Sequence, residues 1–317
     1  MREMRKAPAL RASRMMQEVA DGLRKPQKEL PPKYFYDPLG SMLFDEITRL
    51  PEYYLTRIES RLLDSFGRNW LAEQRPASLV ELGAGSGEKT RILLDALSAG
   101  TWYVPVDLSP SYLEALAGDL GAEYPQLVVR PSRCDITRSL DLPPGLPRPT
   151  VIAFLGSTIG NFDDESAIQL LRRVSAELNE GDRFLIGVDL DKDVRMLEAA
   201  YNDSRGITAA FNLNILRVLN RELGTNFNLD AFAHRAFYNR SEKRIEMHLV
   251  AESPQAIQVP QLGMLLVAAG ESIRTEISCK NDRPSIERLF AASDLELEHW
   301  ITDPGSQYAL VTGRPGR

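Results

Sequence analysis

The segment Val80–Thr90 (VELGAGSGEKT) constrains the fold more than any other part of the chain, because three glycines at alternate positions separate an apolar run from a helical pattern. The apolar run 78–82 predicts a buried strand, and the apolar residues of 88–97 fall on one side of a predicted helix. Glycines in such a turn let a ligand approach the backbone closely, and the first N–H groups of the following helix point at it. The segment therefore predicts a ligand-binding turn between a strand and a helix.

Strands and helices continue to alternate up to residue 188, which is typical of βαβ units in a mainly parallel sheet with right-handed crossovers. The predicted strands are 102–106, 127–130, 151–155 and 183–188, and the predicted helices are 109–120 and 163–178.

The pattern changes after residue 192, where a block of helices is followed by a block of strands. This order indicates an insertion of α+β type inside the βαβ pattern. A helix and a hairpin across Asp303–Ser306 then return the chain to the sheet. The predicted helices of this part are 193–201, 208–223 and 285–292, and the predicted strands are 234–238, 244–251, 264–269, 271–278, 295–301 and 308–312.

The spacing of the glycines separates three classes of ligand. A P-loop for nucleotide phosphates requires a lysine directly after its last glycine, but Glu88 stands between Gly87 and Lys89. A dinucleotide-binding turn, G-x-G-x-x-G, would need a glycine at position 88. What remains is E-x-G-x-G-x-G, the motif of class I S-adenosylmethionine (SAM) methyltransferases.

Carboxylates around the turn agree with this ligand. Glu81 and Glu88 would repel a pyrophosphate, whereas SAM carries a sulfonium and an ammonium group and no phosphate. Asp107 ends the second strand, where a carboxylate can bind both ribose hydroxyls, and Asp135 follows the third strand, where an acid can accept from the adenine amino group. Either aspartate alone could cap a helix or form a turn. Together they favour SAM, and the cofactor-binding residues predicted from the pattern are Glu81, Gly83, Gly85, Gly87, Asp107 and Asp135.

We therefore expect an α/β fold, in which the Rossmann-like sheet of a class I SAM methyltransferase carries an inserted α+β substrate-binding domain. The methyltransferase core would consist of residues 58–191 and 284–317. The substrate-binding domain would consist of residues 1–57 and 192–283, with an amphipathic helix near 11–24.

Composition limits the partners. The formal net charge of −6 argues against a nucleic-acid-binding surface, and two cysteines are too few for a disulfide framework or a cysteine-rich zinc site. No apolar run approaches the ~18 residues of a membrane span, and the basic N-terminal residues are not followed by the apolar run of a secretion signal. We expect a cytoplasmic monomer that binds no metal, nucleic acid or membrane.

Longer motifs resemble one particular family, the L-histidine Nα-methyltransferases of ergothioneine biosynthesis. These motifs are 30–54 (LPPKYFYDPLGSMLFDEITRLPEYY), 154–162 (FLGSTIGNF), 210–214 (AFNLN), 234–239 (HRAFYN), 244–249 (RIEMHL) and 273–278 (IRTEIS). The resemblance runs from about residue 30 to the C-terminus. It implies that SAM is the cofactor and that L-histidine is the substrate, whose α-amine is methylated three times to give hercynine.

The resemblance also implies a pocket for the imidazole ring. Glu276 and Ser278 match a Glu and a Ser that grip the two ring nitrogens, and Met247 matches a methionine that lines the pocket. Residues two apart on a strand share a face, and an acceptor with a second polar group suits the two nitrogens of imidazole. The same family contains methyltransferases of other aromatic amino acids such as tryptophan, which stay the alternative. An indole would leave the buried carboxylate poorly paired.

Further roles follow from the same resemblance. Tyr53 and Tyr201 match tyrosines that hold the substrate carboxylate, and Asn161 matches an asparagine that holds the head group. Tyr36 and Phe44 match aromatic residues beside the amine, so Tyr36 and Asn161 are the predicted catalytic residues. No histidine falls in a segment placed at the amine, and we expect solvent or a held water to take its proton. Four more residues complete the implied set, Gly156 and Thr158 beside the substrate and Gly83 and Lys89 beside SAM.

Two other classes of function are weaker. A macromolecule methyltransferase acting on RNA or protein would need a basic surface or a base-reading motif such as N-P-P-[YF] after the fourth strand, where this chain has Gly156–Asn161. A dehydrogenase-like or non-catalytic module lacks support because the third glycine of the dinucleotide pattern is missing and the set of pocket residues is intact.

Overall fold

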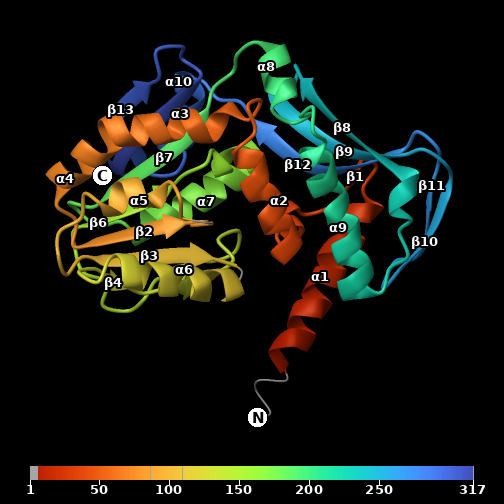
Figure 1. Ribbon diagram of the computed structural model, residues 1–317, viewed down its shortest axis with the longest axis horizontal. Coiled ribbons are helices and arrows are strands. Elements are labelled where there is room, and N and C mark those ends of the chain that lie inside the picture. The colour runs from red at the N-terminus through yellow and green to blue at the C-terminus, as the bar shows by residue number, and fades with distance from the viewer. Residues whose placement is uncertain (1–5, 86, 109, 317) are drawn as a thin grey trace. The chain divides into compact units, whose positions relative to one another are not determined.

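The computed structural model describes residues 6–85, 87–108 and 110–316 (Figure 1). Two compact units share the chain. The insert unit consists of the residues up to Tyr53 together with Asp193–Ser278, and the core unit consists of Tyr54–Lys192 together with the residues from Cys279 onward. Ser86 of the glycine turn and Ser109, the first residue of a predicted helix, lie outside the described residues. The functional assignment of the predicted ranges 1–57, 58–191, 192–283 and 284–317 stays a prediction.

The core unit is built on one sheet with the strand order β13-β14-β7-β6-β2-β3-β4, in which β5 also pairs with β3. β2, β3, β4, β5, β6 and β7 pair in parallel, whereas β14 pairs antiparallel with both β7 and β13. The predicted parallel sheet with a closing hairpin is therefore confirmed. The strands are β2 (Ser78–Leu82), β3 (Trp102–Asp107), β4 (Val128–Val129), β5 (Ser132–Arg133), β6 (Thr150–Phe154), β7 (Arg183–Asp189), β13 (Leu295–Thr302) and β14 (Tyr308–Pro315).

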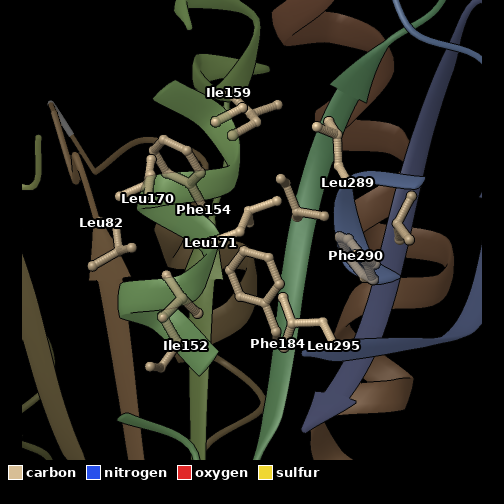
Figure 2. Packing of buried hydrophobic residues seen from close by; sticks show 14 of the residues in the cluster. Leu82, Ile152, Phe154, Ile159, Leu170, Leu171, Phe184, Leu289, Phe290 and Leu295 are labelled. Carbon is tan, nitrogen blue, oxygen red and sulfur yellow. The ribbon is translucent and has the colours of Figure 1, made fainter. Parts of the chain in front are cut away.

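Helices cover the central strands, which explains why β2 and β6 are buried along their whole length. On one face, Phe154 and Phe184 of the sheet belong to the same apolar cluster as Leu170, Leu171 and Phe290 of two helices (Figure 2). The helices of this unit are α3 (Tyr54–Leu62), α4 (Arg68–Gln74), α5 (Thr90–Leu94), α6 (Pro110–Glu123), α7 (Asp164–Glu177) and α10 (Arg283–Ala291), with a π-helical turn at Leu63–Gly67.

Local sequence signals fix several helix ends. The Asp163 carboxylate accepts from the Ser166 N–H at 2.9 Å and begins α7, and Asp282 and Ser285 form a capping box at α10. The predicted helix over 88–97 was too long, because only Thr90–Leu94 is α-helical. The residues after Leu94 close in tight turns, in which the Leu97 N–H donates to the Leu94 carbonyl at 3.1 Å.

The insert unit contains a second sheet, ordered β1-β12-β9-β8, and a separate hairpin of β10 and β11. The prediction missed β10 and the helix α2, although Asp37 and Pro38 form a capped helix start there. The elements are α1 (Lys6–Arg24), β1 (Lys28–Glu29), α2 (Pro38–Thr48), α8 (Val194–Ala199), α9 (Ile207–Leu223), β8 (Phe232–Asn239), β9 (Arg244–Ala251), β10 (Gln255–Val259), β11 (Gly263–Val267) and β12 (Ser272–Cys279), with short 3-10 turns at Pro32–Phe35 and Leu229–Ala231.

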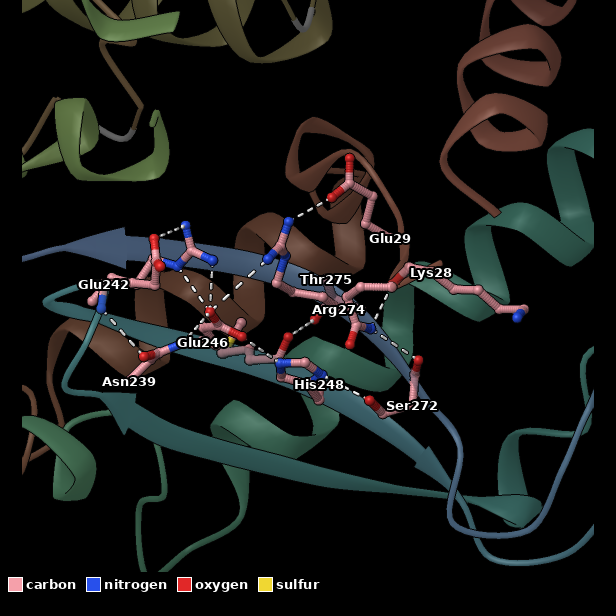
Figure 3. A network of polar contacts seen from close by, with 12 residues as sticks. Lys28, Glu29, Asn239, Glu242, Glu246, His248, Ser272, Arg274 and Thr275 are labelled. Atoms are coloured by element: carbon pink, nitrogen blue, oxygen red, sulfur yellow. Dashed lines mark hydrogen bonds and ion pairs between the residues drawn. The ribbon is translucent and has the colours of Figure 1, made fainter. Parts of the chain in front are cut away.

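An ion-pair network crosses this second sheet (Figure 3). Glu246 accepts from Arg244 at 2.7 Å, and its other oxygen lies 2.9 Å from His248 Nε2. Arg274 reaches Glu29 at 2.6 Å, which ties β12 to β1. Burial would raise the pKa of Glu246, but the hydrogen bonds from His248 and Arg244 lower it below its usual value. His248 Nδ1 also lies 3.0 Å from the Ser272 hydroxyl of β12, so the network connects β9, β12 and β1.

No helix in the described part of the chain combines the length and the apolar character that crossing a membrane would need. Over the same residues, no group of three or more His, Cys, Asp or Glu side chains is arranged to hold a metal ion.

Candidate active site

The glycine turn follows β2 in the core unit and leaves room for a ligand. Gly83, Gly85 and Gly87 all have positive φ angles, of 68°, 52° and 69°. A Cβ built on Gly83 would meet no atom within 4 Å, so the space beside this backbone is open. The Gly83 N–H donates to the Val106 carbonyl at 2.8 Å, which places the turn beside the end of β3. The predicted strand, turn and helix are confirmed as elements, with the shorter helix given above.

The two predicted aspartates lie at the same edge of the sheet. Asp107 is the last residue of β3, and Asp135 follows β5, which pairs with the end of β3. The Cys134 N–H donates to the Asp107 carbonyl at 3.1 Å, so the two segments are joined directly. Asp135 also accepts from the Thr137 N–H at 3.2 Å. The carboxyl ends of neighbouring parallel strands thus bring Gly83, Asp107 and Asp135 to one edge, which is where such sheets bind ligands.

Glu81 stands one residue before the end of β2. Its side chain is buried and accepts from the Thr90 hydroxyl and from the Tyr103 hydroxyl, both at 2.6 Å. Burial raises the pKa of Glu81, and burial together with this carboxylate raises the pKa of Tyr103 well above its usual value. The carboxylate therefore fixes the start of α5 against β2 and β3.

Lys89 is held by a carboxylate that sequence reasoning missed. Glu59 of α3 is fully buried, and it accepts from Lys89, from the Gly156 N–H at 2.7 Å and from the Tyr308 hydroxyl at 2.6 Å. A Cβ on Gly187 of β7 would overlap the Glu59 carboxylate and the Tyr308 hydroxyl, so this glycine makes room for them. Glu59 thereby joins two residues of the predicted site, Lys89 and Gly156.

A second missed carboxylate lies at the end of β7. Asp189 is fully buried and accepts from Lys192, from Lys280 at 2.8 Å and from the Tyr54 hydroxyl at 2.8 Å. Burial would raise the pKa of Asp189, but the two lysines lower it below its usual value. Burial lowers the pKa of Lys192 to about 8. The Asp189 N–H also donates to the Ser157 hydroxyl at 2.9 Å, which connects this cluster to the loop after β6.

That loop contains Gly156, Thr158 and Asn161. Gly156 and Ser157 both adopt left-handed backbone conformations, with φ angles of 77° and 55°. The Thr158 hydroxyl donates to the Leu155 carbonyl at 2.8 Å, and Asn161 ends the 3-10 turn Thr158–Asn161. The three predicted residues therefore share one short, internally bonded loop.

In the insert unit, four predicted residues form a row of aromatic rings. The ring centroids of Tyr36 and Phe44 are 5.7 Å apart, those of Phe44 and Tyr53 are 6.3 Å apart, and those of Tyr53 and Tyr201 are 6.4 Å apart. All three pairs are edge-to-face. Tyr36 is 39% exposed, whereas Tyr53 and Tyr201 are buried. The fold thus brings together side chains that are up to 165 residues apart in the sequence.

The row continues into the predicted ring pocket. The Tyr201 hydroxyl donates to the Ser278 hydroxyl at 2.8 Å, and both residues are buried. Glu276 lies two residues earlier on β12 and is half-buried. Met247 is buried on β9, the neighbour of β12 in the sheet, and its carbonyl lies 3.1 Å from the Thr275 hydroxyl. Their roles toward a substrate stay predictions.

Comparison with known proteins decides the family. The family model described as histidine-specific methyltransferase, SAM-dependent, matches residues 15–315. The chain belongs to this family. It is 42% identical over 303 residues to the histidine N-alpha-methyltransferase of Mycolicibacterium smegmatis, covering 94% of each chain. It is 32% identical over 225 residues to ergothioneine biosynthesis protein 1 of Schizosaccharomyces pombe, covering 67% of this chain and 29% of that protein.

A solved structure supports the fold of this family member. An S-adenosylmethionine-dependent methyltransferase from Clostridium acetobutylicum superposes with a TM-score of 0.51 at 14% identity, over 86% of this chain and 98% of that one. The similarity shows the fold alone. The predicted α/β class with a Rossmann-like methyltransferase sheet is therefore confirmed, and the family membership makes SAM the methyl donor.

The residues of the core unit fit this cofactor. The open space beside Gly83 admits a ligand against the backbone, and two aspartates lie at the neighbouring strand ends. Lys89, the basic side chain of the turn, is already paired with Glu59, whereas a phosphate ligand would require a lysine directed at it. The donor set therefore suits a cationic nucleoside better than a nucleotide phosphate.

Proposed function

We propose that the protein transfers methyl groups from SAM to the α-amine of L-histidine, three times in succession, to give hercynine for ergothioneine biosynthesis. The observation that supports this most is the hydrogen bond between Tyr201 and Ser278. Glu276 lies two residues before Ser278 on the same strand, β12. This arrangement offers a carboxylate and a hydroxyl for the two nitrogens of an imidazole ring. The 42% identical histidine N-alpha-methyltransferase supports the same substrate.

When bound, SAM supplies a methyl carbon activated by its sulfonium. The core unit would hold it through the Gly83 turn, with Asp107 at the ribose and Asp135 at the adenine. Lys89 would lie on the same side, its charge balanced by Glu59. Methyl transfer needs no protein nucleophile, so these residues act by binding and orientation.

The insert unit would hold the amino acid. Tyr53 and Tyr201 bind the carboxylate, and Glu276, Ser278 and Met247 bind the ring. With both ends of the substrate fixed, the amine can rotate between transfers.

The acceptor must be a neutral amine. A model α-amine titrates near pKa ~8, so a proton is lost before each transfer. We propose that Tyr36 and Asn161 act on the amine and on a water that removes this proton, and that Phe44, Gly156 and Thr158 contact the amino acid. Each transfer replaces an N–H by a methyl group, and aromatic faces such as those of Tyr36 and Phe44 interact favourably with a methylated cation.

We further propose that the protein acts as a monomer in the cytoplasm, without nucleic acid. If the pure protein elutes as a dimer in size-exclusion chromatography, the proposed monomeric state is wrong.

The test is an assay with SAM and either histidine or tryptophan, read by mass spectrometry. We expect mono-, di- and trimethylated histidine and little or no methylated tryptophan. Glu276→Ala should lose most activity with histidine, because a ring N–H loses its acceptor. The exposed Glu252 of the same unit gives the matched control, Glu252→Ala, which should keep full activity. Methylation of tryptophan in preference to histidine would establish the alternative substrate.

A further inference from the structure

Two asparagines on α9, within the motif 210–214, have no role in the function proposed above. Asn212 and Asn214 are both fully buried. A buried amide is costly unless its donors and acceptors are satisfied, so such residues in the middle of a helix require a reason. Residues two apart on a helix point about 200° apart, to opposite sides. The two side chains therefore serve different neighbours.

Asn212 joins three strands of the insert sheet. Its Nδ2 donates to the His248 carbonyl of β9 at 3.0 Å and lies 2.8 Å from His234 Nδ1 of β8. Its Oδ1 accepts from the Thr275 hydroxyl of β12 at 2.6 Å. His248 and Thr275 are the sequence neighbours of Met247 and Glu276. One amide thus binds residues that neighbour Met247 and Glu276 of the predicted ring pocket, through the His248 carbonyl and the Thr275 hydroxyl.

The chain of bonds continues from Asn212 to Tyr201. His234 Nε2 lies 2.8 Å from the Tyr201 carbonyl, which can only accept, so the ring proton sits on Nε2. Nδ1 then accepts from Asn212. Burial lowers the pKa of His234, which keeps the ring neutral, as this pattern requires. Tyr201 is therefore held at its backbone by His234 and bonded at its hydroxyl to Ser278.

Asn214 holds a different segment. Its Nδ2 donates to the Asp37 carboxylate at 2.8 Å and to the Phe35 carbonyl at 3.3 Å. These residues stand directly before and after Tyr36. Phe211 of the same motif stacks on Phe35 with ring centroids 4.5 Å apart and lies edge-on to Tyr36 at 5.7 Å. The amide and the ring together fix the backbone that presents Tyr36.

We propose that Asn212 and Asn214 are positioning residues that divide the amino-acid site between them. Asn212 positions the groups that grip the substrate ring and carboxylate, and Asn214 positions Tyr36 at the amine. This inference rests on the proposed function, because it assumes that both sets of contacts, those to the ring and carboxylate and those to the amine, are made to histidine.

The test compares Asn→Asp substitutions at three positions of the same helix. Each replaces the amide by a carboxylate of the same shape and removes its N–H donors. Asn220 is the matched control, because its amide donates to the Phe227 carbonyl and accepts from the Thr225 hydroxyl, both at 2.8 Å, and touches no predicted site residue. The corresponding Asn→Ala variants serve where an Asp variant does not fold. Thermal unfolding and steady-state kinetics with histidine are measured for all of them.

We expect N212D to raise KM for histidine about tenfold with kcat nearly unchanged, and N214D to lower kcat about tenfold with KM nearly unchanged. N220D should lower the melting temperature without changing either constant. A pH profile of kcat/KM adds a readout that a structural role would not move, because the carboxylate of N212D favours protonated His234 and should shift the acidic limb. If N212D and N214D alter kcat and KM together, or only lower the melting temperature as N220D does, the inference is wrong. Failure of the unaltered protein to methylate histidine would instead reject the proposed function.

Discussion

The two units support their predicted site residues by different means. In the core unit, the buried carboxylate of Glu59 binds Lys89 and the Gly156 N–H, and Asp189, which lies between two lysines, donates its N–H to the Ser157 hydroxyl of the same loop. In the insert unit, aromatic rings and a chain of amide, imidazole and hydroxyl bonds surround Tyr201 and Ser278, and the carboxylate of Asp37 accepts from Asn214. If the proposed function is right, paired buried charges support the side of the methyl donor, and aromatic rings with mostly neutral bonds support the side of the amino acid. Removing a charge in the core unit should therefore cost more than removing a neutral bond in the insert unit.

The largest effect is expected from Asp189→Asn. This change removes the negative charge between two buried ammonium groups and should lower the free energy of unfolding by about 3–5 kcal/mol. Urea denaturation measures it. Asp191→Asn, at an exposed position two residues further on, is the control and should stay within about 0.5 kcal/mol of the original protein. A loss below about 1 kcal/mol for Asp189→Asn would mean that the charge does not organise this region.

Glu59→Gln should come next. The amide would present an N–H to Lys89, so the lysine and the Gly156 loop would shift, and affinity for S-adenosylhomocysteine should fall about 30- to 100-fold. Titration calorimetry gives the affinity without any turnover. Tyr308→Phe removes only a neutral donor from the same carboxylate and should cost less than about tenfold. If both variants lose affinity for S-adenosylhomocysteine equally, the charge of Glu59 matters no more than its neutral hydrogen bond from Tyr308.

Tyr201→Phe removes one neutral bond from the acceptor side. Without the hydroxyl that reaches Ser278, KM for histidine should rise about tenfold while the affinity for S-adenosylhomocysteine stays the same. Tyr124→Phe in the core unit, which loses a similar bond to Asp95 at 2.9 Å, is the control and should change neither value. An unchanged KM would show that this hydroxyl supports neither Ser278 nor the binding of the substrate carboxylate.

The smallest effect concerns pH. Burial lowers the pKa of both His234 and His248 from the usual 6.5, so between the folded values and about pH 6.5 the unfolded chain binds more protons. Stability should therefore fall by roughly 1 kcal/mol as pH drops from about 7.5 to 5.5, and His234→Gln should flatten the slope. Denaturation at both pH values tests this, and the difference between the two proteins isolates the ring from other groups that titrate in this range, such as Glu81, whose pKa is raised by burial. A slope that is unchanged in His234→Gln would show that this ring titrates alike in both states.

Much of the core unit could be predicted from sequence, because buried strands and glycine turns leave local patterns. In the core unit, the strand Ser78–Leu82 has the predicted ends, and the loop with Gly156 and Asn161 follows a predicted strand. In the insert unit, the alternating strand Arg244–Ala251 also has the predicted ends. The helices between residues 38 and 74 were missed, although Asp37 before Pro38 is a clear start signal.

The groups that support the site could not be predicted in the same way. Apart from the Lys192 that pairs with Asp189, the partners described for Glu59, Asp189 and Asn212 lie 22 to 249 residues away, and no local period reveals such bonds. One signal was nevertheless present for Glu59. Glu59 lies on the buried side of α3, together with Tyr54, Leu55 and Leu62. A charge in the middle of an apolar stripe indicates a buried partner.

The binding of L-histidine, measured by calorimetry with and without S-adenosylhomocysteine, tests the proposed substrate most directly. We expect heat of binding for histidine in the presence of S-adenosylhomocysteine, weaker or absent heat for tryptophan, and loss of the histidine signal in Glu276→Ala. If histidine gives no heat under either condition, histidine is not the substrate.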